Sequence, residues 1–110
     1  MKWYKPLFFS ENLTSVWKQR SVLYKLANNI LQKDVYVISL CENGKDLFRI
    51  IPAQELLQKG YPKADMLVVG VSKGKEEAFR LVETIVQQIY IQDGNLESVR
   101  EYFKTGRKRK

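Results

Sequence analysis

Histidine is absent from this sequence, and its absence excludes several kinds of active site. Without an imidazole the chain has no histidine general base, no Ser-His or Cys-His nucleophilic pair and no histidine-ligated metal. The one cysteine, Cys41, has no second thiol in the chain with which to form a disulfide or a zinc site. Because no imidazole could activate it, we expect Cys41 to be a thiol packed in the core.

Long apolar runs are absent as well. The longest is residues 66–71, which is far shorter than the ~20 residues of a membrane-spanning helix. The aromatic start of the chain is too short and too interrupted to be the core of a signal peptide. Together with the free thiol, these features predict a cytoplasmic protein with no membrane segment.

The residues that are present have the composition of a folded domain. The chain has 110 residues, of which 45% are hydrophobic and 28% are charged. Residues 1–103 are predicted to form a single α+β domain. Residues 104–110 are rich in Lys and Arg and contain no apolar residue, so we expect a disordered basic tail there.

Hydrophobic periodicity and turn residues predict the secondary structure. A long helix is expected over residues 10–33, beginning near Ser10, with an apolar side made of Leu13, Val16, Leu23, Tyr24, Ala27, Ile30 and Leu31. Strands are expected at 35–41 and 46–51, joined at Asn43-Gly44, because this pair favours a type I′ hairpin turn. The remaining elements are a short helix at 53–59, a strand at 66–71, a helix at 75–92 and a short helix at 96–103.

The predicted order is therefore α-β-β-α-β-α-α. It corresponds to an α+β fold in which a small, three-stranded, mostly antiparallel sheet packs against two long helices. Strand 35–41 or strand 66–71 should be central in this sheet, since both are apolar on both faces.

Aromatic residues crowd the start of the chain. They are Trp3, Tyr4, Phe8 and Phe9, which surround Pro6. A proline is compatible with an edge strand or a packed arm but not with a central strand. The aromatic segment either folds back on its own sheet or docks on a second copy, because Trp and Tyr are favoured at interfaces. These four residues are our candidate interface, and a homodimer is the partner it suggests.

The strand–turn–helix around residues 70–75 is the most site-like feature. A glycine turn that opens onto a helix N-terminus can bind an anion through backbone N–H groups. The candidate residues are Ser72, Lys73, Gly74 and Lys75, with Arg20 or Arg49 nearby. The P-loop pattern is incomplete, because Glu76 stands where a Ser or Thr would bind magnesium. A solvated turn between strand and helix is the alternative, and Arg20 has a structural alternative as a charged head at the rim of the core.

Basic residues are concentrated at the two ends of the chain, whose formal net charge is +7. The candidate residues for binding a polyanion are Lys18, Lys25, Arg107, Lys108, Arg109 and Lys110. No stacking platform is expected beside Lys18 and Lys25, because Trp17 and Tyr24 are assigned mostly to the apolar side of the helix. Asp34, Asp46 and Asp65 precede strands and could meet at a divalent cation, but acids at strand ends are commonly solvated. We expect no metal and no cofactor.

These observations predict a small non-catalytic module that acts by binding. The favoured hypothesis is an interaction domain that self-associates through its aromatic N-terminal segment and a sheet edge. Two alternatives stay open. One is a weak binder of nucleic acid or another polyanion through the N-terminal helix and the tail, and the other is an anion-ligand site at residues 70–75. An enzyme is the less favoured class.

Overall fold

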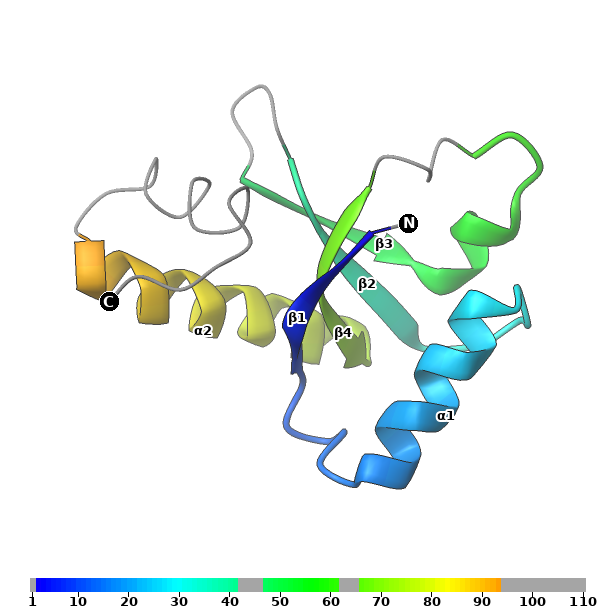
Figure 1. Ribbon diagram of the computed structural model, residues 1–110, viewed down its shortest axis with the longest axis horizontal. Coiled ribbons are helices and arrows are strands. Elements are labelled where there is room, and N and C mark those ends of the chain that lie inside the picture. The colour runs from blue at the N-terminus through cyan, green and yellow to red at the C-terminus, as the bar shows by residue number, and fades with distance from the viewer. Residues whose placement is uncertain (1, 42–46, 62–65, 94–110) are drawn as a thin grey trace.

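Four strands and two α-helices make up the part of the chain described by a computed structural model, residues 2–41, 47–61 and 66–93 (Figure 1). The elements in chain order are β1 (Lys2–Phe9), α1 (Val16–Ala27), β2 (Val35–Leu40), β3 (Phe48–Pro52), the 3₁₀ helix η1 (Ala53–Leu57), β4 (Leu67–Lys73) and α2 (Lys75–Asp93).

The four strands form one mixed sheet in the order β1-β4-β2-β3. Strand β2 is antiparallel to both β3 and β4, whereas β1 is parallel to β4. The α+β class is confirmed, and β2 and β4, the two alternatives for the central strand, are both central. The prediction of three mostly antiparallel strands beginning with a helix is wrong, because the aromatic N-terminal segment adds a parallel strand at the edge.

Pro6 explains why β1 lies at an edge. Lys2 and Trp3 pair with Leu67 and Val68, the register then shifts, and Phe8 pairs with Gly70. Proline has no N–H to donate to a neighbouring strand, so it is tolerated at an edge and at an irregularity. The same interruption makes β1 a poor template for adding another strand.

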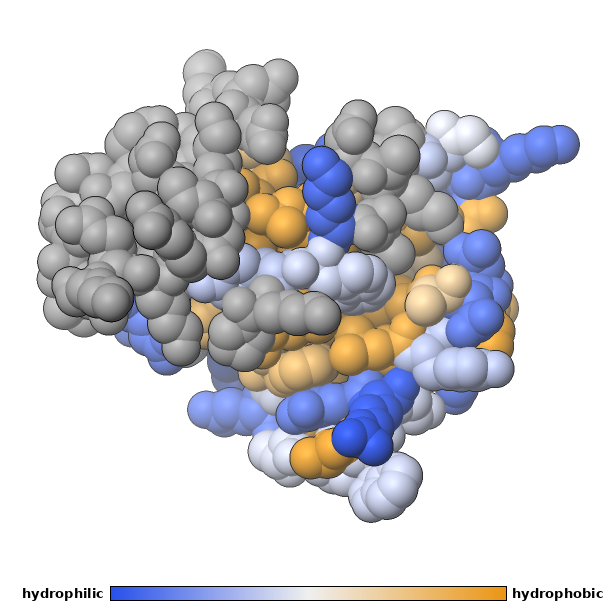
Figure 2. All heavy atoms as spheres, viewed as in Figure 1, coloured by the Kyte–Doolittle hydropathy of each residue, from blue (hydrophilic) through white to orange (hydrophobic). Residues whose placement is uncertain are grey.

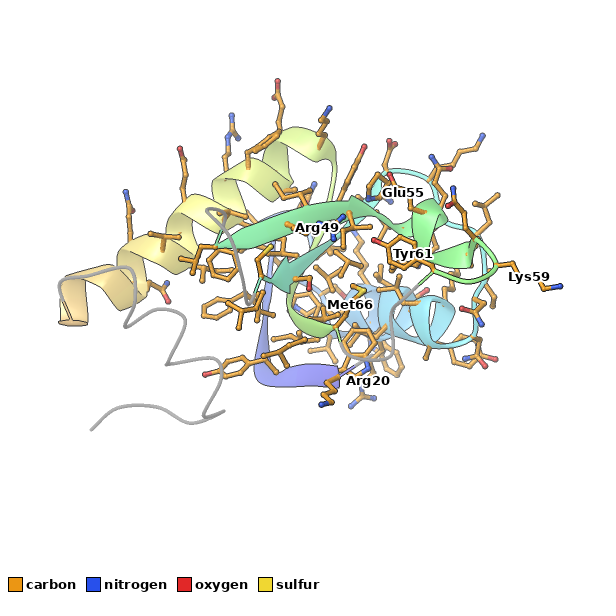
Figure 3. The ribbon with its side chains drawn as sticks, turned by 90° about the horizontal axis from the view of Figure 1, so that it is seen from above. Arg20, Arg49, Glu55, Lys59, Tyr61 and Met66 are labelled. Atoms are coloured by element: carbon orange, nitrogen blue, oxygen red, sulfur yellow. The ribbon has the colours of Figure 1, made fainter. Side chains whose placement is uncertain are left out.

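The sheet lies between the two helices. Alternate residues of a strand point to opposite faces, so Val35 and Val37 of β2 join the core on the α1 side. Ile38 and Leu40 join the core on the α2 side. Helix α1 contributes Val22 and Leu26 to the first core, while Leu81 and Ile85 of α2 belong to the second. The view from above shows the two helices on either side of the central strands (Figure 3).

Helix α1 is half as long as the sequence predicts, and a different side of it is buried. It begins after Ser15 and ends at Ala27, and Asn29 adopts a left-handed φ of 57° that stops the helix. Of the side predicted to be apolar, six residues are exposed or only half-buried in this structure: Val16, Leu23, Tyr24, Ala27, Ile30 and Leu31. The prediction fails because it fitted one helical phase to three segments with different conformations.

The second half of the chain follows the prediction more closely. Helix α2 covers the expected range, and Ala78, Leu81 and Ile85 of its apolar side are buried. The short helix at 53–59 is the 3₁₀ helix η1, which is followed by Gly60 at a φ of 83°. The turn at Asn43-Gly44, the helix at 96–103 and the tail at 104–110 lie outside the described residues. No helix in the described ranges has the length and apolarity needed to cross a membrane.

Candidate functional site

Helix α1 presents three different surfaces beside its buried face. Since successive residues of a helix are turned by 100°, residues seven apart lie on nearly the same side. Lys18 and Lys25 project from one flank, and Trp17 and Tyr24 project from the outer side. The remaining flank, which carries Arg20, faces strand β1. Each surface adjoins a different part of the molecule.

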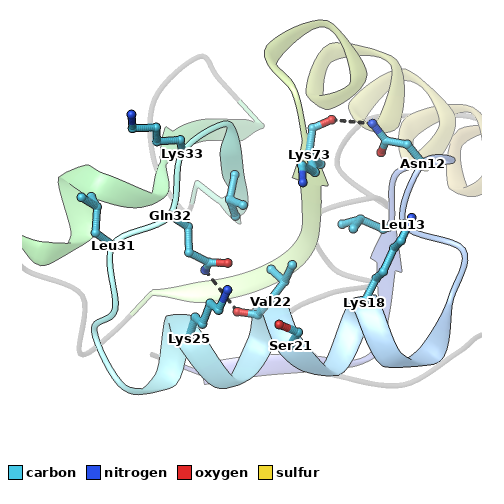
Figure 4. A pocket seen from close by; sticks show the side chains of 11 residues that line it. Asn12, Leu13, Lys18, Ser21, Val22, Lys25, Leu31, Gln32, Lys33 and Lys73 are labelled. Atoms are coloured by element: carbon cyan, nitrogen blue, oxygen red, sulfur yellow. Dashed lines mark hydrogen bonds between the residues drawn. The ribbon is translucent and has the colours of Figure 1, made fainter.

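The first flank borders a hollow of ≈380 Å³ that we call the lysine cleft (Figure 4). Four exposed lysines line it. Lys18 and Lys25 come from α1, Lys33 from the segment before β2, and Lys73 from the end of β4. The other lining residues are uncharged: Asn12, Leu13, Ser21, Val22, Leu31, Gln32 and Val35. In Figure 4, Lys25 and Lys73 extend toward the hollow, whereas Lys33 stands at its rim and points away.

Hydrogen bonds between distant segments hold the walls of the lysine cleft. Ser10 Oγ accepts a bond of 3.2 Å from the backbone N–H of Lys73, and Asn12 Nδ2 donates one of 2.8 Å to the carbonyl of Lys73. On the opposite wall, Gln32 Nε2 donates to the carbonyl of Val22 at 3.2 Å. These contacts fix the backbone from which Lys73 projects, while its ammonium group is left to solvent.

Among the described residues, no carboxylate lines the lysine cleft. Helix α1 carries three basic residues and no acidic one. Within the described ranges, the ion pair that the structure contains joins Arg80 and Glu77 on α2 and involves none of the cleft lysines. Bringing like charges together costs free energy, so an uncompensated cluster in a concave site favours an anionic ligand.

The residues of the anion site expected at 70–75 lie in different surroundings: Ser72 is buried, while Lys73 and Lys75 line two different hollows. Ser72 is fully buried and its hydroxyl donates to the carbonyl of Gly74 at 3.1 Å. The backbone N–H of Lys73 donates to Ser10 Oγ, and that of Gly74 donates to the carbonyl of Asp34 at 2.6 Å. The Ser72 hydroxyl and the backbone N–H groups of Lys73 and Gly74 are therefore occupied by hydrogen bonds within the protein. Lys75 lines a separate hollow beside β3 with Arg49 and Phe79.

Arg20 lines neither the lysine cleft nor the hollow beside β3. It is exposed, and its guanidinium carbon lies 5.9 Å from the centroid of the Trp17 ring. It borders an apolar groove of ≈470 Å³ between α1 and β1, whose other lining residues are Trp3, Leu7, Phe9, Val16, Gln19, Leu23 and Ala27. Figure 3 shows Arg20 beside this groove and Arg49 well apart from it on β3, and Figure 2 shows apolar side chains gathered between β1 and α1.

The aromatic N-terminal segment folds back on its own sheet. Tyr4 is 3% exposed in the core on the α2 side, where Phe8 also packs. Trp3 and Phe9 pack on the α1 side and line the apolar groove. Tyr4 is thus unavailable as an interface residue in this conformation, whereas Trp3 and Phe9 retain some exposed surface.

Trp17 and Tyr24 are the residues that the sequence analysis misplaced most. Their exposed fractions are 77% and 65%, so they stand out from α1 instead of facing the core. The sequence does contain a signal for them, because each directly precedes a lysine and the two pairs are seven residues apart. That spacing places both aromatic rings on one side of the helix, next to the lysines.

Groups suited to metal binding are not gathered in the described part of the chain, where no three His, Cys, Asp or Glu side chains converge. Asp46 and Asp65 lie outside that part, so their predicted convergence with Asp34 stays a prediction. Cys41 is half-buried at the end of β2, and its backbone N–H donates to the carbonyl of Leu47 at 2.8 Å. Comparison of the chain with family models, curated proteins and solved structures gives no match.

Proposed function

We propose that the protein binds a phosphate-bearing polyanion in the lysine cleft. The observation that supports this function is the arrangement of four exposed lysines around one hollow, which no acidic residue of the described ranges lines. Such a site attracts anions over distances of about a Debye length and neutralises phosphates on contact. The net charge of +7 acts in the same direction.

The spacing of the lysines favours several phosphates over a single one. Lys18 and Lys25 are two helical turns apart, which separates their Cα atoms by about 10 Å. Lys73 faces them from the end of β4. A chain of phosphates can contact these ammonium groups in succession, whereas one phosphate satisfies at most those that converge on it. The cleft volume of ≈380 Å³ is also within the range of ligand-binding sites.

Binding of long-chain inorganic polyphosphate tests this proposal. We expect the double variant Lys25→Gln/Lys73→Gln to bind about tenfold more weakly, because it removes the two ammonium groups that extend toward the hollow. The control, Lys59→Gln/Lys75→Gln, removes the same net charge from exposed positions outside the cleft and should lose less than about threefold. Equal losses in the two variants, or no binding by the unmodified chain, would contradict a specific role for the cleft.

A second candidate function is self-association through the apolar groove. Glu76, Phe79 and Glu83 share one stripe of α2 at positions i, i+3 and i+7, and Phe79 is 54% exposed. This acidic stripe with an apolar anchor complements the groove and its neighbour Arg20 on a second copy. The contact would join unlike surfaces, so it would be a head-to-tail contact.

Sedimentation velocity over a range of concentrations tests self-association. Arg20→Glu and Glu83→Lys should each weaken assembly alone, and an equimolar mixture of the two variants should restore assembly in which the variants alternate. The restoration is expected because every contact between unlike variants joins opposite charges, either the original pair or the exchanged pair. A monomer at all concentrations, or loss without restoration in the mixture, rules this contact out.

A further inference from the structure

Helix α1 carries two aromatic–lysine pairs on its exposed surface. Trp17 precedes Lys18, and Tyr24 precedes Lys25, one heptad further along the helix. The lysines line the lysine cleft, and the aromatic rings are 77% and 65% exposed beside it. Large aromatic side chains contribute most to stability when they are buried, so two of them held out on the most basic helix of the described chain require an explanation.

We infer that the polyanion is a single-stranded nucleic acid, whose phosphates follow the cleft lysines and whose bases stack on Trp17 and Tyr24. This inference rests on the proposed function, because the phosphate contacts are those of the lysine cleft. It adds a second type of contact that inorganic polyphosphate cannot make. Stacking of bases on aromatic side chains above a basic groove is a general means of binding single strands without reading their sequence.

The geometry of α1 suits the two chemical parts of a nucleotide, the phosphate and the base. Adjacent residues of α1 project about 100° apart, so each ring stands on the outer surface while the following lysine points to the cleft. A strand that runs along α1 can therefore direct its phosphates to Lys18 and Lys25 and its bases to Trp17 and Tyr24. The two platforms are about 10 Å apart along the helix axis.

Arg20 adds a cationic group on the other flank of α1, beside Trp17. Its guanidinium group lies between the two pairs in sequence and 5.9 Å from the centroid of the Trp17 ring. An arginine over a tryptophan face is stabilised by cation–π attraction, and its planar group can itself stack on a base or bind a phosphate. Helix α1 thus alternates aromatic and cationic groups with no acidic residue among them.

The same surface discriminates against a duplex. In double-stranded DNA or RNA the base faces are covered by neighbouring base pairs, so exposed rings have no unstacked base to contact. A duplex can still place phosphates on the lysines. We therefore expect a single strand to bind more tightly than a duplex of equal length, and the difference should come from Trp17 and Tyr24.

Tryptophan fluorescence tests this inference directly. The chain has two tryptophans, so the Trp3→Phe variant leaves Trp17 as the reporter. We expect oligo(dT) and oligo(U) of about 12 nucleotides to quench Trp17, and inorganic polyphosphate to bind without quenching. In the unmodified background, Trp17→Ala and Tyr24→Ala should each weaken oligonucleotide binding roughly five- to 100-fold and leave polyphosphate binding unchanged.

The controls separate this inference from the proposed function. Ile30→Ala removes another exposed apolar side chain, just after α1, and should leave both affinities unchanged. If polyphosphate binds at the cleft but Trp17 is not quenched and the two aromatic variants bind oligonucleotides normally, the inference is wrong and the proposed function stands. If neither polymer binds, both are wrong. A duplex that quenches Trp17 as strongly as a single strand would overturn the preference for single strands.

Discussion

Ser10 joins two parts of the chain that are 63 residues apart, and it shows how single polar side chains build the lysine cleft. It is 4% exposed, and it accepts from the backbone N–H of Lys73 while donating to Asn12 Oδ1 at 2.5 Å. Asn12 completes the connection by donating to the carbonyl of Lys73. The sequence predicts a helix that begins near Ser10, because Ser before an amphipathic run is a usual start signal. Its actual partner comes from β4, and no local pattern could have revealed that.

Replacement of Ser10 by Ala should destabilise the fold by about 1–3 kcal/mol. The substitution leaves the N–H of Lys73 without its acceptor at a site that is largely closed to water. Urea denaturation followed by circular dichroism measures the change. Ser21→Ala, at an exposed position on α1, is the control and should alter stability by less than about 0.5 kcal/mol. Equal stability of the two variants would show that the Ser10 contact is not formed.

Gly70 illustrates a close approach between layers. A Cβ atom at this position would lie 3.2 Å from Leu81 Cδ2 of α2 and 3.4 Å from the carbonyl oxygen of Phe8 in β1. We expect Gly70→Val to cost about 1–3 kcal/mol, because the added methyl groups must push α2 away from the sheet. Gly60→Asn is the control, since nothing lies within 4 Å there and Asn tolerates a positive φ. Thermal unfolding of both variants checks this, and an unchanged Gly70→Val protein would contradict the packing of α2 on β4.

The two helices differ in how well their sequences predict them. In α2 one phase of apolar residues continues along the helix, and Ala78, Leu81 and Ile85 on the side predicted to be apolar are buried. In residues 10–33 the apolar positions belong to a loop, a helix and a second loop, and Asn28 and Asn29 follow the end of the helix. This Asn pair was the available signal, since Asn is the residue after Gly that most readily adopts left-handed backbone. Lys18 and Lys25 could be grouped from helical spacing, but Lys33 and Lys73 join them through tertiary structure.

Leu26 and Leu31 distinguish the observed buried side of α1 from the predicted one. Leu26 is 6% exposed and lies in the core, while Leu31, on the side predicted to be apolar, is 58% exposed. Leu26→Ala should cost about 2–5 kcal/mol by opening a cavity, and Leu31→Ala should cost less than about 1 kcal/mol. Chemical denaturation of the pair measures this difference. A larger cost for Leu31→Ala would restore the longer helix predicted from periodicity.

Over the whole molecule, the charges of the two helices differ in sign. Helix α1 has three basic and no acidic residues, whereas Glu76, Glu77 and Glu83 outnumber Lys75 and Arg80 among the described side chains of α2. We therefore expect a polyanion to approach the α1 side of the sheet, where the lysine cleft and the two aromatic rings lie. The division of charge was visible in the sequence as a basic start and a mildly acidic middle. Its assignment to opposite sides of a sheet required the strand order.

The last prediction concerns residues 107–110 and the salt dependence of oligonucleotide binding by the full chain. Each phosphate contact to a single strand contributes about 0.7 to the slope of log Kd against log salt concentration. Removal of Lys25 and Lys73 should therefore lower the slope by about 1.4, and deletion of residues 107–110 by up to about 3 if all four side chains bind phosphates. Titrations of a labelled oligonucleotide at several salt concentrations measure both changes.

The two changes in slope should add in the variant that combines the substitutions with the deletion, because separate phosphates are contacted. A slope that the deletion leaves unaltered would assign binding to the α1 side alone, whereas a slope that follows the deletion and ignores the cleft substitutions would move the site to the tail.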